Sequence, residues 1–519
     1  MTENEIMKTK NLFLLPALIA SFGLIPAGRV MGQTFTTLHS FAPGTGGYYP
    51  TNSDGASPYG ELVLSGDTLY GTAEVGGGSG NGTVFRVNTD GTGFTNLHTF
   101  SAGSGSFPDV TNSEGAGPYG GLVLSGNTLF GTAIVGGSSG NGTVFRLNID
   151  GTGFTNLHTF AAGSGSIPSL TNSDGANPFA GLILSNNTLY GAAVFGGSSG
   201  NGTLFALNTD GTGFTNLHDF AAGSGSFPDL TNSDGAGPFA GLMLSNNTLY
   251  GTAEVGGSSG NGSVFKVNAD GTDFTNLHNF TPLIYPGGTN SDGDGSRARL
   301  ILSGNTLYGV SHNGGASGYG TVFALSTDGT GFTNLHNFPA LNAPFPYPNS
   351  DGAVPNKLIL SGHTLYGTAE IGGTSGNGTV FALNTDGSGF TNLHSFTLGT
   401  GGDFPTNSDG ALPRAGLILS GNALYGTASQ GGSSGNGTVF SVSLPAPRLT
   451  LVHSDTNVVL MWPTDNGGFD FTGYTLQSAS NLVSPTVWTN VSPAPVAVNG
   501  QNAVTNPISG PQQFYRLNQ

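Results

Sequence analysis

Residues 118–160 read PYGGLVLSGNTLFGTAIVGGSSGNGTVFRLNIDGTGFTNLHTF, and this stretch decides the fold. It contains four runs rich in β-branched and aromatic residues, PYGGLVLS, TLFGTAIV, TVFRLN and FTNLHTF, which is the composition of strands. Polar turns separate these runs, and in NIDGTG the Asp-Gly pair supplies the positive φ that a tight hairpin needs. The stretch therefore predicts four short strands joined in order by turns.

This unit repeats along most of the chain, from Thr34 to Ser443. The segment LHxF occurs seven times at intervals of 58 to 60 residues, and each time LYG and GTVF, or close variants, accompany it. A longer link with the core NSDGA joins one unit to the next. Four strands per repeat indicate the blades of a β-propeller.

The two ends of the repeat region are complementary. It opens with a lone fourth strand, TFTTLHSF at Thr34 to Phe41, and closes with GTVFSVS, whose fourth strand is missing. The first strand can complete the last blade and so remove the exposed edges of an open array. We therefore predict an all-β protein with a seven-bladed β-propeller over residues 34–443 and velcro closure. A linear β-solenoid is the alternative, and it has no need of this permuted strand.

The segments LYGTA, GG, GTVF and DG resemble the Gly-rich GloVer (Gloeo/Verruco) tandem repeat of exported bacterial proteins. The resemblance covers residues 34–443, and seven copies agree with it. It implies export and display at the cell surface, and it implies no reaction.

The pattern stops at a linker, residues 444–447, and a different composition follows. Residues 448–519 hold both tryptophans, Trp462 and Trp488, in segments that alternate apolar and polar residues, so they predict a small β-sandwich. NVVLMWP and FYRL are similar to segments of fibronectin type III-like modules of exported bacterial proteins. Two roles for this module are open: it attaches or sorts the exported protein, or it serves only as a spacer.

Composition excludes several classes of protein. Only 8% of the 519 residues are charged, against about 25% in ordinary domains, so neither a disordered coil nor a helical protein fits. The net charge of −17 repels phosphate backbones, and nucleic acid is excluded as a partner. The chain has no cysteine, so disulfides and thiolate chemistry are absent.

The N-terminus predicts export. Lys8 and Lys10 precede an apolar run from Leu12 to Ile25, and small residues follow, which is the order of a secretory signal peptide over residues 1–32. No second long apolar segment appears in the sequence. We expect a secreted or cell-surface protein without a transmembrane segment in the mature chain, and we expect a monomer.

Motifs that repeat in every unit are interpreted as structural. GGSSG at Gly136 to Gly140 matches a nucleophile-elbow pattern but lies in a loop between strands rather than between a strand and a helix. The LHxF histidines belong to outermost strands and cannot converge, so a packing or hydrogen-bonding role is expected. The NSDG and DG acids are explained by Asx turns; each loop offers one carboxylate, so no cofactor is expected and calcium is a minor alternative.

Positions that differ between units are more informative, and two of them flank the start of each first strand. If these strands are innermost, both positions face one mouth of the central channel. The first is aromatic in the early units and cationic or Pro in the later ones: Tyr59, Tyr119, Phe179, Phe239, Arg297, Pro355 and Arg414. The second is Gly except at Glu61, Arg299 and Lys357. A third position on the same face, at the end of each second strand, includes Glu254, His312 and Glu370.

Two interpretations of this mouth are open. In the first, the variation reflects drift among diverging repeats. In the second, the mouth binds a ligand: Arg297, Arg299, Lys357 and Arg414 would bind carboxylate or sulfate groups, and the aromatic faces would bind sugar rings. We expect an exported, non-enzymatic scaffold or binding module for an extracellular polysaccharide, another anionic ligand or a cell-surface component. A polysaccharide lyase or glycosidase using His312, Glu254 or Glu370 is one alternative, and a purely structural or adhesive protein is another.

Overall fold

The computed structural model describes residues 33–46, 50–105, 110–225, 227–344, 346–401, 405–454, 456–466, 469–471, 474–483, 486–508 and 512–518. Within these ranges the chain is all-β and contains no helix. None of the described segments could therefore cross a membrane as a helix. The signal peptide expected over residues 1–32 lies outside the described residues.

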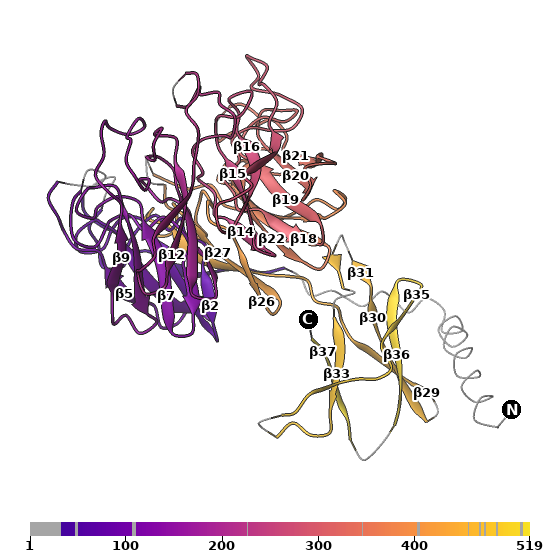
Figure 1. Cartoon of the computed structure of the whole chain (residues 1–519). Coiled ribbons are helices and arrows are strands. Elements are labelled where there is room, and N and C mark those ends of the chain that lie inside the picture. Colours follow the sequence, from indigo (N-terminus) through magenta and orange to yellow (C-terminus); the bar gives the residue numbers. More distant parts are fainter. Residues whose placement is uncertain are drawn as a thin grey trace.

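Four-stranded antiparallel sheets make up the repeat region, and its arrangement is β-propeller-like (Figure 1). The described strands form seven such sheets here, which we number 1 to 7 in chain order. Sheets 1 to 3 contain β2 (Val63–Ser65), β3 (Thr68–Ala73), β4 (Thr83–Asn88) and β5 (Thr95–Thr99); β6 (Val123–Ser125), β7 (Thr128–Ala133), β8 (Thr143–Asn148) and β9 (Thr155–Thr159); and β10 (Ile183–Ser185), β11 (Thr188–Ala193), β12 (Thr203–Asn208) and β13 (Thr215–Asp219).

The remaining four sheets have the same order of strands. Sheets 4 and 5 contain β14 (Met243–Ser245), β15 (Thr248–Ala253), β16 (Ser263–Asn268) and β17 (Thr275–Asn279); and β18 (Ile301–Ser303), β19 (Thr306–Ser311), β20 (Thr321–Ser326) and β21 (Thr333–Asn337). Sheets 6 and 7 contain β22 (Ala353–Ser361), β23 (Thr364–Ile371), β24 (Thr379–Asn384) and β25 (Thr391–Ser395); and β26 (Ile418–Ser420), β27 (Ala423–Ala428), β28 (Thr438–Ser443) and β1 (Phe35–Ser40).

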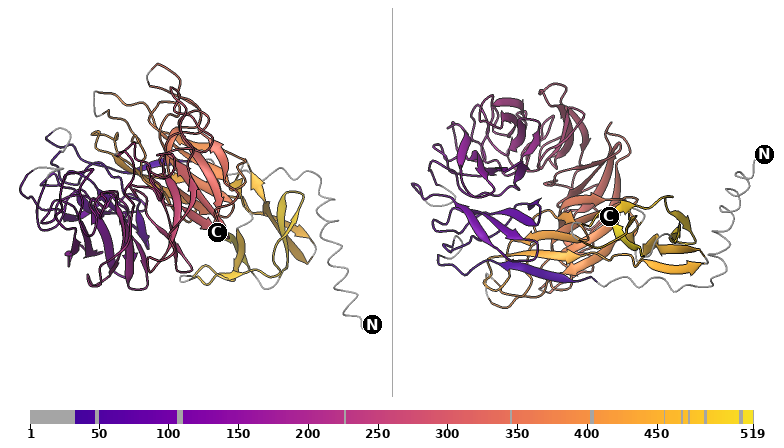
Figure 2. Two further views of the ribbon diagram at one scale, coloured as in Figure 1. Left: turned by 45° about the horizontal axis from the view of Figure 1, so that its top comes forward. Right: turned by 90° about the horizontal axis from the view of Figure 1, so that it is seen from below.

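The strand that opens the repeat region belongs to its last sheet. β1 is antiparallel to β28, with Phe35 opposite Val442 and Ser40 opposite Thr438. In the right-hand view of Figure 2 the indigo first strand runs beside the orange strands of sheet 7, and the sheets surround a common centre.

Turn chemistry sets the strand boundaries. In the first DG hairpin, Asp90 Oδ1 accepts the backbone N–H of Thr92 at 2.9 Å, and Gly91 has a φ of +84°. This is the Asx turn that the sequence predicts.

β22 spans Ala353–Ser361, but the other six first strands are shorter than PYGGLVLS predicts, and β6 begins only at Val123. The residues before it bond to the neighbouring sheet instead: Thr72 Oγ1 of sheet 1 donates to the Gly120 carbonyl at 3.2 Å. Thr132 of sheet 2 makes the same bond to the Ala180 carbonyl at 3.0 Å. These segments therefore join consecutive units at the centre.

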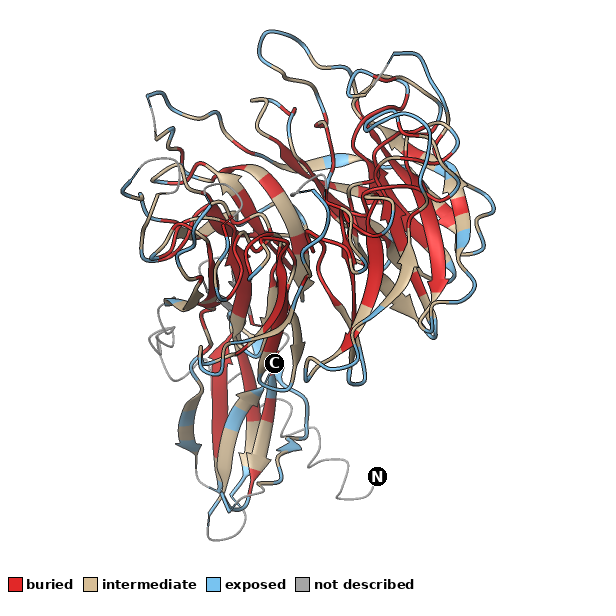
Figure 3. Ribbon diagram, turned by 90° about the vertical axis from the view of Figure 1, so that its left-hand side faces the viewer, coloured by how far each residue is buried: buried red, intermediate tan, exposed pale blue. Residues whose placement is uncertain are grey.

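The cores lie between consecutive sheets. Tyr70 and Val84 of sheet 1 pack against Leu129 and Phe145 of sheet 2, and all four are buried. An equivalent cluster joins sheet 7 to sheet 1. Each fully buried aromatic side chain contributes about 1.5–3 kcal/mol to folding, and Figure 3 shows this burial concentrated in the middle strands.

The repeated histidines have the structural role predicted for them. His39 Nε2 lies 2.9 Å from Asp54 Oδ2, and the imidazole stacks on Phe94 of the next sheet with ring centroids 3.6 Å apart. Both Asp54 oxygens also accept the backbone N–H of Ala42 at 3.0 Å. Seven such pairs are present among the described residues: His39–Asp54, His98–Glu114, His158–Asp174, His218–Asp234, His278–Asp292, His336–Asp351 and His394–Asp409.

One detail of the prediction for the NSDG links is wrong. The Asx turn is made by the asparagine, because Asn52 Oδ1 accepts the N–H of Gly55 at 2.9 Å. The aspartate is thereby free to accept hydrogen bonds from the outer strand.

The C-terminal residues form separate sheets. One contains β29 (Thr450–Ser454), β30 (Asn457–Pro463), β36 (Gln501–Pro507) and β35 (Val496–Val498); another contains β34 (Thr489–Asn490), β33 (Thr475–Ala479) and β37 (Phe514–Asn518); β31 (Asp465–Asn466) pairs with β32 (Phe469–Asp470). Leu460, Leu476 and Val504 of the two larger sheets share one core with Trp462. The Tyr474 hydroxyl donates to Asn422 Oδ1 at 2.9 Å, which ties these sheets to the turn before β27.

Candidate functional site

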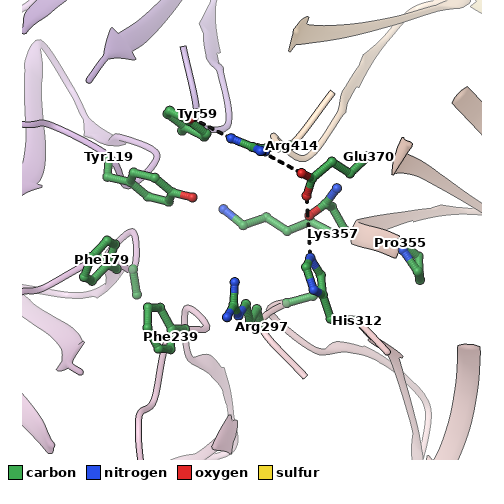
Figure 4. Close-up of a pocket in the computed structure, with 13 residues that line it drawn as sticks. Tyr59, Tyr119, Phe179, Phe239, Arg297, His312, Pro355, Lys357, Glu370 and Arg414 are labelled. Atoms are coloured by element: carbon green, nitrogen blue, oxygen red, sulfur yellow. Dashed lines mark hydrogen bonds and ion pairs between the residues drawn. The ribbon is translucent and has the colours of Figure 1, made fainter. Parts of the chain in front are cut away.

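A cavity of about 340 Å³ lies where the central segments of the sheets meet (Figure 4). Its lining includes most of the residues that the sequence singled out. The lining residues are Tyr59, Tyr119, Phe179, Ala180, Phe239, Arg297, Ala298, His312, Pro355, Asn356, Lys357, Glu370 and Arg414.

Four aromatic side chains form an arc along one side of the cavity. Tyr59 and Tyr119 stack with ring centroids 4.5 Å apart, Phe179 meets Tyr119 edge-on at 5.3 Å, and Phe239 follows Phe179 at 5.1 Å. They come from equivalent positions in four consecutive units, so the repeat itself builds the arc. Burial raises the pKa of both tyrosines, which keeps their hydroxyls protonated.

An arginine closes each end of the arc. The Arg297 guanidinium lies over the Phe239 ring, 5.1 Å from its centroid, and its Nε donates to Glu254 Oε1 at 2.6 Å. At the other end, Arg414 Nη1 donates to the Tyr59 hydroxyl at 2.6 Å, and Nη2 lies 2.7 Å from Glu370 Oε1.

These ion pairs change the electrostatic interpretation of the mouth. In the ligand-binding interpretation, the clustered cations are there for a carboxylate or sulfate group of a ligand. The structure places carboxylates of the protein beside Arg297, Arg414 and Arg299. The three arginines are therefore balanced internally, and their clustering alone is no evidence for a ligand.

Lys357 differs from the arginines. Among the described side chains, no carboxylate lies within 4.0 Å of its ammonium group. Figure 4 shows this group pointing into the middle of the cavity, opposite the aromatic arc. Burial lowers the pKa of Lys357, and the negative charge of Glu61 acts in the opposite direction.

Glu61 and Arg299 do not line the cavity, and neither does Glu254. Arg299 Nη2 lies 3.5 Å from Glu61 Oε1, which links sheet 5 to sheet 1 across the centre. Glu254 is buried beneath Arg297 and acts as its partner. The three residues thus lie near the cavity without lining it, and a role for them in ligand binding stays a prediction.

His312 and Glu370 complete the charged side of the cavity. His312 Nε2 lies 3.6 Å from Glu370 Oε2 (Figure 4). Burial opposes ionisation of Glu370, but the His312 imidazole and the Arg414 guanidinium outweigh it and hold the pKa of Glu370 at about 2. Glu370 is therefore ionised at any physiological pH.

The sequence analysis missed Ala180, Ala298 and Asn356 in the lining. Each lies between the two variable positions of its own unit. A comparison of this intervening residue across the units could have identified them. Among the residues that the structure describes, no group of three or more His, Asp or Glu could hold a metal ion.

Solved structures with a similar course of the chain share little sequence with it. An oligogalacturonate lyase in complex with manganese is 11% identical and has a TM-score of 0.42; the match covers 81% of this chain and 99% of that one. A putative 6-phosphogluconolactonase from Bacteroides uniformis is 15% identical with a TM-score of 0.42, over 78% and 94% of the two chains. At these values neither structure informs the function of this protein. A search of curated protein sequences found no match.

The match to a family of repeats is specific. The model of the Gloeobacter/Verrucomicrobia repeat matches residues 21–171 and 227–407, more than half of the chain. The match covers units in both the early and the late parts of the repeat region, in agreement with the resemblance carried by LYGTA, GTVF and DG. The chain belongs to the Gloeobacter/Verrucomicrobia repeat family.

Proposed function

We propose that this protein is an exported, non-enzymatic binding module whose central cavity takes an acidic sugar residue of an extracellular glycan. In this proposal residues 34–443 are a closed seven-bladed β-propeller. Residues 448–519 are a fibronectin III-like β-sandwich that attaches or spaces the propeller, after the linker 444–447.

Contacts between the two ends of the repeat region support ring closure. β1 supplies the fourth strand beside β28, and Thr427 Oγ1 of sheet 7 donates to the Pro58 carbonyl, before sheet 1, at 3.0 Å. The latter bond is equivalent to the one from Thr252 Oγ1 to the Ser296 carbonyl at 3.0 Å, between sheets 4 and 5. A linear array gives no reason for the last unit to contact the first in the same way as its neighbours do.

The observation that carries the binding proposal is the ammonium of Lys357, which has no carboxylate within 4.0 Å among the described residues and lies opposite an arc of aromatic side chains in one cavity. A carboxylate is the natural partner of such a group, and a charge-assisted hydrogen bond contributes about 1.5–3 kcal/mol. The Tyr and Phe side chains offer apolar surface to the C–H face of a sugar ring. An acidic sugar has both features in one ring.

Hydrolysis is less well supported. Glycoside hydrolysis usually needs two carboxyl groups with different pKa values across the bond that breaks. Glu370 is the one carboxylate among the described lining residues, and its pKa of about 2 makes it a poor proton donor. A lyase and a purely adhesive role remain alternatives that the same experiment separates.

The test is calorimetric titration with a uronic acid trisaccharide and with the neutral glucose trisaccharide of the same linkage. We expect the acidic sugar to bind and the Lys357→Ala variant to bind it about 10- to 150-fold more weakly. Lys266→Ala is the matched control, because Lys266 lies on β16 and does not line the cavity. Its affinity should equal that of the unaltered protein.

Three results would contradict the proposal. Equal loss of binding in both lysine variants, or no binding of the acidic sugar, leaves a structural or adhesive role. Release of an unsaturated or shortened product during the titration identifies an enzyme instead.

A further inference from the structure

We infer that the cavity receives the end of a glycan chain and excludes its interior, because the central channel is blocked just below the cavity. The inference rests on the proposed function and deepens it. The residues that block the channel are Glu61 and Arg299, which lie outside the cavity lining.

The block is an ion pair that crosses the centre. Glu61 precedes β2 of sheet 1 and Arg299 precedes β18 of sheet 5, and these sheets are not neighbours. Even so, their side chains approach to 3.5 Å. An ion pair between such sheets has to span the axis around which the sheets are arranged.

The channel is also narrow at this level, where four of the other five units have glycine. A Cβ at Gly181 would lie 2.8 Å from the Gly121 carbonyl oxygen, and one at Gly121 would lie 3.0 Å from Glu61 Cβ. Side chains of ordinary size do not fit between these segments. The glycines therefore let the walls close around the Glu61–Arg299 pair.

The Glu61–Arg299 pair and the backbone around it form the floor of the cavity, and Lys357 connects this floor to the cavity. A Cβ at Gly416 would be 3.2 Å from both Lys357 Cδ and Glu61 Cδ, so the lysine stem lies within the floor. Its ammonium rises from there into the cavity (Figure 4). Arg297, with a side chain 48% exposed, marks a rim that solvent reaches.

A polymer cannot thread through a cavity closed in this way. The volume of about 340 Å³ is near the lower end of the range for small-molecule pockets, about 300–1,000 Å³, and suits a terminal ring rather than several. The terminal residue would place its carboxylate at the bottom, on Lys357, with the rest of the chain leaving past the rim. An internal residue has a neighbour on both sides and would meet the floor.

The test compares a uronic acid hexamer with a polymer of the same linkage about ten times longer. End binding predicts about tenfold weaker affinity per uronic acid residue for the polymer, because the concentration of ends falls by that factor. Equal affinity per residue would overturn the inference and leave the proposed function standing. Failure of both ligands to bind would instead refute the proposed function, and the inference with it.

A second variant tests the floor itself. Glu61→Gly combined with Arg299→Gly introduces the glycine that four of the other five units carry at this position, so the fold should tolerate it. With the floor removed, the difference in affinity per residue between hexamer and polymer should shrink. An unchanged tenfold difference in a folded variant would show that the Glu61–Arg299 pair is not what excludes chain interiors.

Discussion

The outer histidine–acid pairs and the central cavity are built from the same repeat but in opposite ways. At the outer pairs, each histidine lies beside a carboxylate, an aspartate in six units and Glu114 in one, and stacks on a phenylalanine, as His39 and His158 do. At the cavity, equivalent positions hold Tyr, Phe, Arg and Pro. Residues that recur in every unit therefore have a structural role that every unit needs. Residues that differ between units at equivalent positions around the centre make an asymmetric cavity within a symmetric arrangement of sheets.

The largest expected effect comes from removing the strand that joins the two ends of the frame. Deleting Thr34 to Phe41 removes β1 and the buried Phe41, and leaves β28 with an unpaired edge. We expect aggregation or a large fall in Tm, measured by scanning calorimetry with size-exclusion chromatography. A monomeric variant with unchanged Tm would show that the frame does not depend on closure.

The next effect concerns Glu74, which occupies in the first unit the position that Glu254 and Glu370 occupy in the fourth and sixth. Burial raises the pKa of Glu74 to about 7, while Arg414 acts in the opposite direction. Because the folded-state pKa is raised, Glu74 favours the folded state at acidic pH, and this contribution is lost as pH rises through about 7.

Glu74→Gln should therefore stabilise the protein at alkaline pH by up to about 3 kcal/mol, and the gain should vanish on acidification. Denaturant unfolding over a range of pH measures it. A gain that is the same at every pH would contradict a titrating Glu74.

The next prediction concerns the loss of the histidine from one of the repeated histidine–acid pairs. His158→Ala leaves the Asp174 carboxylate without its imidazole partner and should cost about 1–3 kcal/mol at neutral pH. His218→Ala should cost the same, since its unit is built alike, and neither should alter binding at the cavity. Clearly unequal costs would show that the repeated pairs are not equivalent.

The pH dependence of these pairs has a defined sign. Burial raises the pKa of Asp292 and of Asp409, but hydrogen bonds from the histidine and from a threonine outweigh it and lower the pKa of each. Their contribution to stability is present above the unfolded-state pKa and is lost as pH falls through the lowered values. Acid unfolding of the unaltered protein should therefore begin below about pH 4.

The smallest effect is expected in the loop with the nucleophile-like motif. Ser138 is exposed between β7 and β8, and Ser138→Ala should change stability by less than about 0.5 kcal/mol. Ser433→Ala should behave in the same way. Covalent labelling of either serine by an active-site phosphonate would contradict the structural interpretation of GGSSG.

Local patterns predicted most of the frame. Asp-Gly turns, strand composition and the 58- to 60-residue period gave the four strands of each sheet and their order. They could not give the partners of Arg297 and Arg414, because Glu254 and Glu370 come from the end of the second strand in the preceding unit, and only the packing of neighbouring units brings them together. The contact of Glu61 with Arg299 depends on the geometry of the whole arrangement, which no single unit encodes.

We propose that the divergent centre, and Lys357 in particular, binds an acidic sugar. Outside the first 32 residues the chain has two lysines, Lys266 and Lys357, so acetylation followed by mass spectrometry reports on each separately. If the cavity binds the acidic sugar, a saturating uronic acid trisaccharide will slow acetylation of Lys357 and leave the rate of acetylation of Lys266 unchanged. The neutral trisaccharide should protect neither lysine. Equal labelling of Lys357 with and without the acidic sugar would contradict it.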